Sequence, residues 1–283
     1  GDWRNALRSA DSGRVKSLYD LFDDVLIDGL LADAISKRID AVLNSELTFL
    51  DKDGKEVEEI AAIMDTTDWE ELLRQIMNER VYGRSGVEFI YTPDSLHIAP
   101  IPPKHINLYN KCIVINDTDE KGIPYEGDSS LLVLGHERNY GLLLKATPYA
   151  IYKRGGFGDW SQWVELFGMP QRVGKYNAYD PESRKLLEQA MEQAGSAPYI
   201  IIPKEAEVET KEADNGNGTS YNEFRQACNE EMLITILGQT LTTVQGENGA
   251  RSLGEVHKDV EEGKNRSDMR FVQRVLNNRV LPM

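Results

Sequence analysis

Carboxylates are the most abundant side chains in this sequence that could do chemistry. The 283 residues include 47 Asp and Glu against 32 Lys and Arg, a formal net charge of −15. Two carboxylates facing one site can hold a pair of divalent metal ions for phosphodiester hydrolysis, so the count leaves a metal-dependent nuclease open. The obvious pairs, such as Glu58-Glu59 and Glu230-Glu231, are chain neighbours, which diverge by about 100° on a helix. We therefore expect solvated helix faces and no metal site.

Motifs for nucleophilic or metal-assisted catalysis are missing from the sequence. There is no Walker phosphate loop, zinc-protease signature or CxxC pair, and Gly83–Gly86 is one residue too short for a nucleophile elbow. The histidines and cysteines show no metal-ligand spacing: His97, His105, His136, His257, Cys112 and Cys228. We predict a protein that is not an enzyme, has no cofactor and buries its two cysteines as reduced thiols.

Two stripes of side chains could contact nucleic acid. Trp160, Trp163 and Phe167 could stack on bases, and Arg266, Arg270 and Arg274 could face phosphates or the acids of a neighbouring subunit. Aromatic stripes at helical spacing are more often core, and nearby acids favour a solvated basic helix. The sequence pI near 4.8 also argues against a protein that grips DNA over its whole surface. It leaves open a protein that lets DNA pass without holding it.

The elements that would position these side chains divide the chain near residue 140. Helical spacing of Val15, Leu18 and Phe22 begins the first part, and Thr67–Glu70 fits a capping box for a helix that ends at Gly83. After residue 86, short β-type runs such as Val87–Tyr91 alternate with prolines. We predict an α+β unit for residues 1–140.

Helical patterns dominate the second part. Thr147-Pro148 predicts a helix start, and Gly155-Gly156-Phe157-Gly158 predicts a break or bend within the stripe that follows. Asp180-Pro181 predicts a short helix, with strands near Arg172–Tyr176 and Tyr199–Ile202 on either side. No apolar run reaches membrane-spanning length. Because the chain opens without Met and stops just after a helical pattern, we expect a piece of a longer protein.

Three blocks in the second part resemble the portal proteins of Mu-like tailed phages and prophages. The first contains Tyr152-Lys153, Asp159-Trp160 and Phe167–Tyr176, the second is Ile236–Thr243, and the third is Gly249–His257. Their order and spacing are similar to those of the family. The resemblance covers residues 140–283 well and residues 1–140 more loosely. The glycines at 155–158 depart from the more helix-friendly stretch of the relatives.

The resemblance implies a phage portal fold with a helical stem, an α/β wing and a small α/β clip. The boundaries it implies are a wing at 1–140, a first stem helix at 141–167, a clip at 168–218, a second stem helix at 219–240, a tunnel loop at 241–252, and at 253–283 a helix leading to a crown that this chain lacks. Thr242, Thr243, Gln245, Asn248 and Arg251 would then face the DNA channel. Partners would dock on the clip through Arg172, Lys175, Tyr176, Arg184 and Lys185.

The function implied is that of a head-to-tail connector. Such subunits form a ring, typically a dodecamer, that conducts double-stranded DNA into and out of the capsid without sequence specificity. The implied partners are the terminase large subunit, head-completion or connector proteins, and the capsid and scaffold, with no membrane. The implied location is the virion, with assembly in the host cytoplasm. The alternatives are a carboxylate-metal nuclease and an adaptor module without a channel.

Overall fold

The computed structural model describes all residues except 1, 168–171, 196–198, 208–218 and 241–250. The chain divides into two compact units, one made of residues 1–151 and 228–283, the other of residues 152–227. We call these the first and second units. In the described part, none of the helices combines the length and apolar character that a membrane crossing requires.

Five helices open the first unit: α1 (Asp2–Asp11), α2 (Lys16–Val25), α3 (Gly29–Leu43), α4 (Glu58–Met64) and α5 (Thr67–Tyr82). The apolar face predicted for α2 is buried, with Leu18 and Phe22 completely inside. α3 begins at Asp28, whose carboxylate accepts hydrogen bonds from the N–H groups of Leu30 and Leu31. Such a cap satisfies backbone donors that have no partner within the helix.

The prediction of a capping box at Thr67–Glu70 is wrong, because the N-cap is Thr66 and the residue three positions later, Trp69, has no carboxylate to complete a box. Thr66 has the extended backbone of an N-cap, and its hydroxyl accepts the N–H of Trp69 at 3.2 Å. The helix ends as predicted at Gly83, where φ is +81° and a Cβ atom would overlap the backbone of Asn139 and Tyr140. Glycine is therefore required here both by conformation and by space.

Two antiparallel sheets follow α5. The larger has the order β2-β1-β6 and contains β1 (Arg84–Tyr91), β2 (Leu96–Ile101) and β6 (Leu131–Gly135). The smaller, next to the short 3₁₀ helix η1 (Pro103–His105), contains β3 (Ile106–Asn107), β4 (Cys112–Ile113) and β5 (Ile123–Pro124). Phe89 pairs with Ile98, and both are buried. The α+β class predicted for this part of the chain is confirmed.

Long helices contribute to the same core. The first unit contains the beginning of α6 (Gly141–Phe167), the end of α8 (Thr219–Leu237) and the whole of α9 (Arg251–Val275). A π-helix, η2 (Leu276–Val280), follows α9. Leu143 of α6, Met232 of α8 and Val272 of α9 are completely buried. Cys112 and Cys228 are buried, as predicted, and they form no disulfide bond within the described part of the chain.

The prediction of a helix start at Pro148 and a break at 155–158 is wrong. α6 runs without interruption for 27 residues, with Pro148 inside it. The Thr147 hydroxyl does not cap a helix; it donates to the carbonyl of Leu143 at 2.6 Å, one turn earlier. A Cβ at Gly155 or Gly158 would meet nothing, whereas at Gly156 it would lie 3.0 Å from the Phe224 ring. One glycine thus makes room for an aromatic side chain, and the others add only conformational cost.

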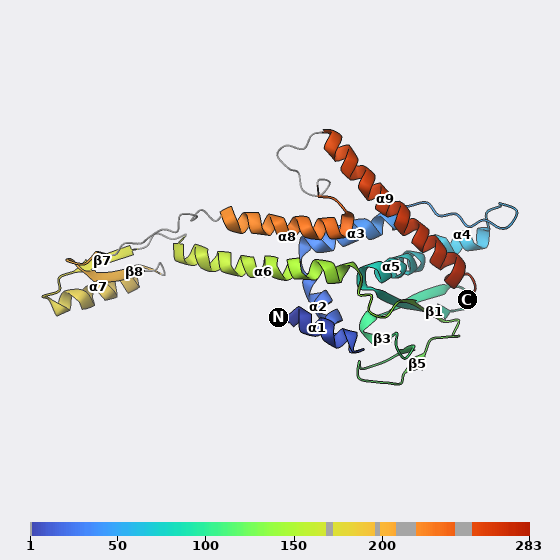
Figure 1. Ribbon diagram of the computed structural model, residues 1–283, viewed down its shortest axis with the longest axis horizontal. Helices are drawn as coiled ribbons and strands as arrows, with labels where there is room; N and C mark the ends of the chain where they lie inside the picture. Colours follow the sequence, from blue (N-terminus) through green and yellow to red (C-terminus); the bar gives the residue numbers. More distant parts are fainter. Residues whose placement is uncertain (1, 168–171, 196–198, 208–218, 241–250) are drawn as a thin grey trace. The chain divides into compact units, whose positions relative to one another are not determined.

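The second unit contains a strand–helix–strand motif (Figure 1). β7 (Arg172–Tyr176) and β8 (Tyr199–Pro203) pair in parallel, joined through α7 (Pro181–Gln193). Asp180 caps α7 by accepting from the N–H groups of Glu182 and Ser183. A helix crossover is what two neighbouring parallel strands require. The strands and the helix predicted here are confirmed.

Candidate functional site

Four of the five predicted DNA-channel residues, Thr242, Thr243, Gln245 and Asn248, lie outside the described residues. The fifth, Arg251, is the first residue of α9. The structure describes the chain on both sides of this segment, namely the end of α8 and the helix α9. The way in which these two ends are held is therefore the part of the candidate site that can be examined.

α8 ends at a glycine that is packed against α9. Gly238 has φ of +79°, and its N–H donates to the carbonyl of Ile234 at 3.0 Å. A Cβ at this position would overlap the side chain of Lys264 on α9. Just beyond, the Gln239 amide donates to the Glu261 carboxylate of α9. The exit from α8 is therefore tied to α9 by both packing and hydrogen bonding.

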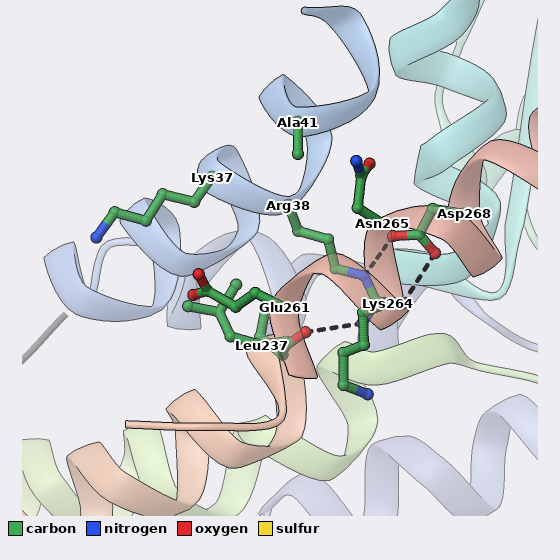
Figure 2. A pocket seen from close by; sticks show the side chains of 9 residues that line it. Lys37, Arg38, Ala41, Leu237, Glu261, Lys264, Asn265 and Asp268 are labelled. Atoms are coloured by element: carbon green, nitrogen blue, oxygen red, sulfur yellow. Dashed lines mark hydrogen bonds and ion pairs between the residues drawn. The ribbon is translucent and has the colours of Figure 1, made fainter. Parts of the chain in front are cut away.

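Arg38 of α3 joins three helices at this point. Its guanidinium donates to the Asp268 carboxylate through Nε at 2.8 Å and Nη2 at 3.0 Å, and through Nη1 to the Ile236 carbonyl at 2.7 Å. Figure 2 shows this side chain reaching from α3 toward Asp268 of α9. A guanidinium suits this position because its planar fork binds a carboxylate with two bonds and still has donors left for a carbonyl. Arg38 thus satisfies a backbone acceptor at the C-terminus of α8.

A second arginine completes the cluster. Arg80 of α5 forms an ion pair with Asp268 at 3.5 Å, and its guanidinium lies 4.6 Å from the centre of the Phe271 ring. The Asp268 side chain has no solvent exposure, and that of Arg38 is 9% exposed. We call Arg38, Arg80 and Asp268 the Asp268 cluster. Burial lowers the pKa of the neighbouring Lys264, and the positive charges of Arg38 and Arg80 lower it further.

A cavity of about 240 Å³ adjoins the Asp268 cluster, lined by α3, α8 and α9 (Figure 2). Its walls hold Lys37, Lys264 and Asn265 beside apolar atoms of Ala41 and Leu237. None of the residues that line it is a Ser, Thr, Cys or His. Within the described ranges, no three His, Cys, Asp or Glu side chains come together as a metal site. The Asp268 cluster instead fastens four helices, α3, α5, α8 and α9, where α8 ends.

The predicted partner-docking residues lie together in the second unit. Arg172 donates to the Ala194 carbonyl at 2.9 Å, and the Arg184 guanidinium lies 5.7 Å from the centre of the Tyr176 ring. These three side chains therefore support the motif internally. Lys175 and Lys185 are exposed. The sequence analysis did not predict the two exposed apolar side chains of this strand–helix–strand motif, Tyr179 at 90% and Leu186 at 64% exposure.

The two stripes with possible nucleic-acid contacts differ in their surroundings. The ring centres of Trp163 and Tyr221 lie 6.5 Å apart, and those of Trp160 and Phe157 lie 6.0 Å apart. Trp160 is nevertheless 38% exposed and Phe157 44%, so the expectation that this stripe is core is wrong for Trp160. The side chain of Phe167 is outside the described part. Arg266, Arg270 and Arg274 are exposed along α9, in agreement with a solvated helix face.

Sequence reasoning also missed the Asp268 cluster, although one signal was available. Asp268 occupies the same helical stripe as Val272 and Val275, which are buried. A carboxylate on an apolar stripe predicts a buried charge, and a buried charge requires a cationic partner. Nothing in the sequence points to Arg38, which lies 230 residues away.

Comparison with known proteins gives one family and two relatives. The family model described as "Portal protein of Mu bacteriophage" matches residues 19–283. The portal protein of Escherichia phage Mu is 33% identical over 128 residues, which are 45% of this chain and 25% of that protein. The Mu-like prophage FluMu protein gp29 of Haemophilus influenzae is 31% identical over 129 residues, 44% of this chain and 25% of that protein. The match thus spans a quarter of the length of each relative. Because the family model matches most of the sequence, this chain belongs to the family described as the portal protein of Mu bacteriophage.

Proposed function

We propose that the chain is part of a portal subunit, a structural component that conducts double-stranded DNA into and out of a phage capsid. The observation that carries the proposal is the family match over residues 19–283. Portal proteins are structural and not enzymes, so the same match disfavours the metal-dependent nuclease.

The division into portal parts is proposed on the order of the elements. Residues 1–140 would be the wing, α6 and α8 the stem helices, and residues 168–218 the clip. The supporting observation is that the small β7-α7-β8 motif lies in the chain between the two helices, as an insertion at the end of a stem would. Residues 241–252 would be the tunnel loop, and the remaining helix would lead to a crown.

In this proposal the Asp268 cluster has a mechanical role. DNA that passes through a ring exerts drag on any segment that touches it, and that segment needs a fixed base. Arg38 holds the last turn of α8 to α9, and Gln239 adds a second tie. Buried charge-assisted hydrogen bonds have defined geometry and are little screened by salt. The end of α8, which precedes residues 241–250 in the chain, is thus held to the middle of α9.

The finer partners follow from the same proposal. Twelve copies would form the ring, and the terminase large subunit and later the connector proteins would dock on the clip. Exposed Lys175, Lys185 and Tyr179 support a docking face there, since they combine charge with an aromatic side chain. Capsid and scaffold would surround the ring, which places the protein in the virion.

The experiment is electron microscopy and a packaging assay with the full-length protein. We expect rotationally symmetric rings for the natural sequence. Replacing Thr243–Gly249 with a shorter linker should leave rings intact and impair DNA packaging or retention. A matched variant with Gly-Gly in place of Lys52-Asp53, in an exposed turn, should behave as the natural protein. Normal packaging and retention in the loop variant would contradict the channel role, and absence of rings would contradict the portal proposal.

A further inference from the structure

A second cavity in the first unit has a buried arginine in its wall. Its volume is about 730 Å³, and it is lined by the end of α1, the start of β1, the loop after β3 and residues 117–121 and 137–140. Arg84, the first residue of β1, is 4% exposed and lines this cavity. No part of the portal proposal uses it.

The hydrogen bonding of Arg84 is incomplete. One nitrogen, Nη1, donates to the Ile106 carbonyl at 2.7 Å, and the guanidinium lies 5.5 Å from the centre of the Tyr19 ring. Nε is buried and has no hydrogen-bond partner. Among the described residues, no carboxylate forms an ion pair with Arg84. A guanidinium carries five N–H donors, and a buried one without a carboxylate is costly, so a partner is missing.

Two of the carboxylates that line this cavity accept hydrogen bonds from other groups. Asp11 accepts the hydroxyl of Tyr140 at 2.9 Å, and burial together with this bond raises the pKa of Tyr140, so that the phenol remains a donor. Asp119 accepts the N–H of Asn116 at 2.9 Å. Acids of the chain thus line the same cavity as Arg84, and in the described part of the chain none of them forms an ion pair with it.

The rim of the cavity decides which anion fits. Five carboxylates line it, against three cations besides Arg84, namely Arg14, Lys121 and Arg138. This negative excess repels a polyanion such as the DNA backbone. The rim can accept a single carboxylate whose neighbour is a lysine or an arginine, because that neighbouring cation then pairs with the acids of the rim. A guanidinium fork and a single carboxylate match in geometry.

We propose that the Arg84 cavity receives an Asp or Glu side chain of a second copy of this chain, an inference that rests on the proposed ring. The surface of the chain presents such groups. Exposed pairs one helical turn apart, Asp33 with Lys37 and Lys258 with Glu262, place a carboxylate beside an ammonium. Insertion of such a carboxylate would pair it with the buried guanidinium of Arg84. The lysine beside that carboxylate would then contact the acids of the cavity rim.

Self-association measured by sedimentation equilibrium, from micromolar to millimolar concentration, tests the proposal. We expect Arg84→Gln and Arg84→Lys to lower the association constant at least about tenfold, because neither offers the fork. Arg14→Gln removes the same charge from the exposed rim and should change it by less than about threefold. An association constant that is unchanged in both Arg84 variants, or a natural chain that stays monomeric throughout, overturns the proposal.

A ligand competition on the natural sequence covers the case in which the Arg84 variants do not fold. Acetate is the probe, compared with chloride at equal ionic strength. We expect about 0.1 M acetate to weaken self-association and to raise the Tm of the monomer by about 2 °C. No effect of acetate on either quantity overturns the proposal. Rings of full-length Arg84→Gln protein that match the natural ones would remove this contact alone and leave the portal function standing.

Discussion

At the residue scale, the Asp268 cluster combines buried ion pairs with a hydrogen bond to the last turn of α8, which precedes the proposed tunnel loop in the chain. Asp268→Ala would leave Arg38 and Arg80 without their common carboxylate in a buried site. We expect the free energy of unfolding, measured with urea, to fall by about 3–5 kcal/mol. Lys258→Ala, which removes an exposed pair with Glu262, is the matched control and should cost less than about 0.5 kcal/mol. Equal effects of the two variants would mean that the cluster contributes no more than a surface ion pair.

Tyrosine burial makes a prediction about alkaline pH. Burial raises the pKa of Tyr19 and of Tyr82 to about 12, from about 10 for a free phenol. The unfolded chain therefore loses these protons first, so the stabilisation is complete below pH 10 and is lost as the pH rises towards 12. The expected loss is about 1.4 kcal/mol per pH unit for each tyrosine.

Urea unfolding at several pH values between 9 and 12 measures this slope. Tyr19→Phe should make it shallower, whatever it costs at neutral pH through the lost bond to the Tyr82 carbonyl. Tyr109→Phe, which removes a phenol that is 75% exposed, serves as the control. A slope that Tyr19→Phe leaves unchanged would show that Tyr19 ionises alike in the folded and unfolded chain.

At the scale of elements, glycines separate what the sequence predicts from what it cannot. The stop at Gly83 is predictable, because a left-handed C-cap depends on the residues of the same turn. The continuity of α6 through Gly155–Gly158 is not, because flanking turns and the Phe224 ring against Gly156 outweigh the local propensity. The strands and helix of residues 172–203 are predictable from local signals such as Asp180-Pro181. The junction of Arg38 with Asp268 depends on tertiary packing that no spacing encodes.

The contrast between the required glycine at the end of α5 and a dispensable glycine inside α6 can be tested with matched Gly→Ala substitutions. Gly158→Ala should raise the helix content and stabilise α6 by about 0.5–1 kcal/mol, since its Cβ would meet no atom. Gly83→Ala should destabilise the first unit by more than about 2 kcal/mol, because the added Cβ is strained by the positive φ and overlaps backbone atoms. Circular dichroism and thermal unfolding report both effects. Destabilisation by Gly158→Ala would indicate that the glycines of α6 are needed for a bend.

At the scale of the whole molecule, the acidic balance suits a protein through which DNA slides. A net charge of −15 gives a polyanion no broad surface to neutralise. The Kd of the chain for duplex DNA should therefore be larger than roughly 10⁻⁴ M, the weak end of the range for non-specific binding at physiological salt. Fluorescence anisotropy of a labelled duplex, titrated at several salt concentrations, measures this affinity and its salt dependence.

The basic stripe on α9 provides the sharpest form of that test. Arg266, Arg270 and Arg274 are exposed at successive turns, so they are the arginines best placed to grip a phosphate backbone. If they did, the logarithm of the affinity would fall steeply with salt, and replacing all three with Gln would reduce that slope by about three. We expect instead a flat salt dependence that the triple variant leaves unchanged, because the net charge of −15 on the whole chain repels the duplex. Micromolar binding that the triple variant abolishes would show that the chain holds DNA, which a sliding contact cannot do.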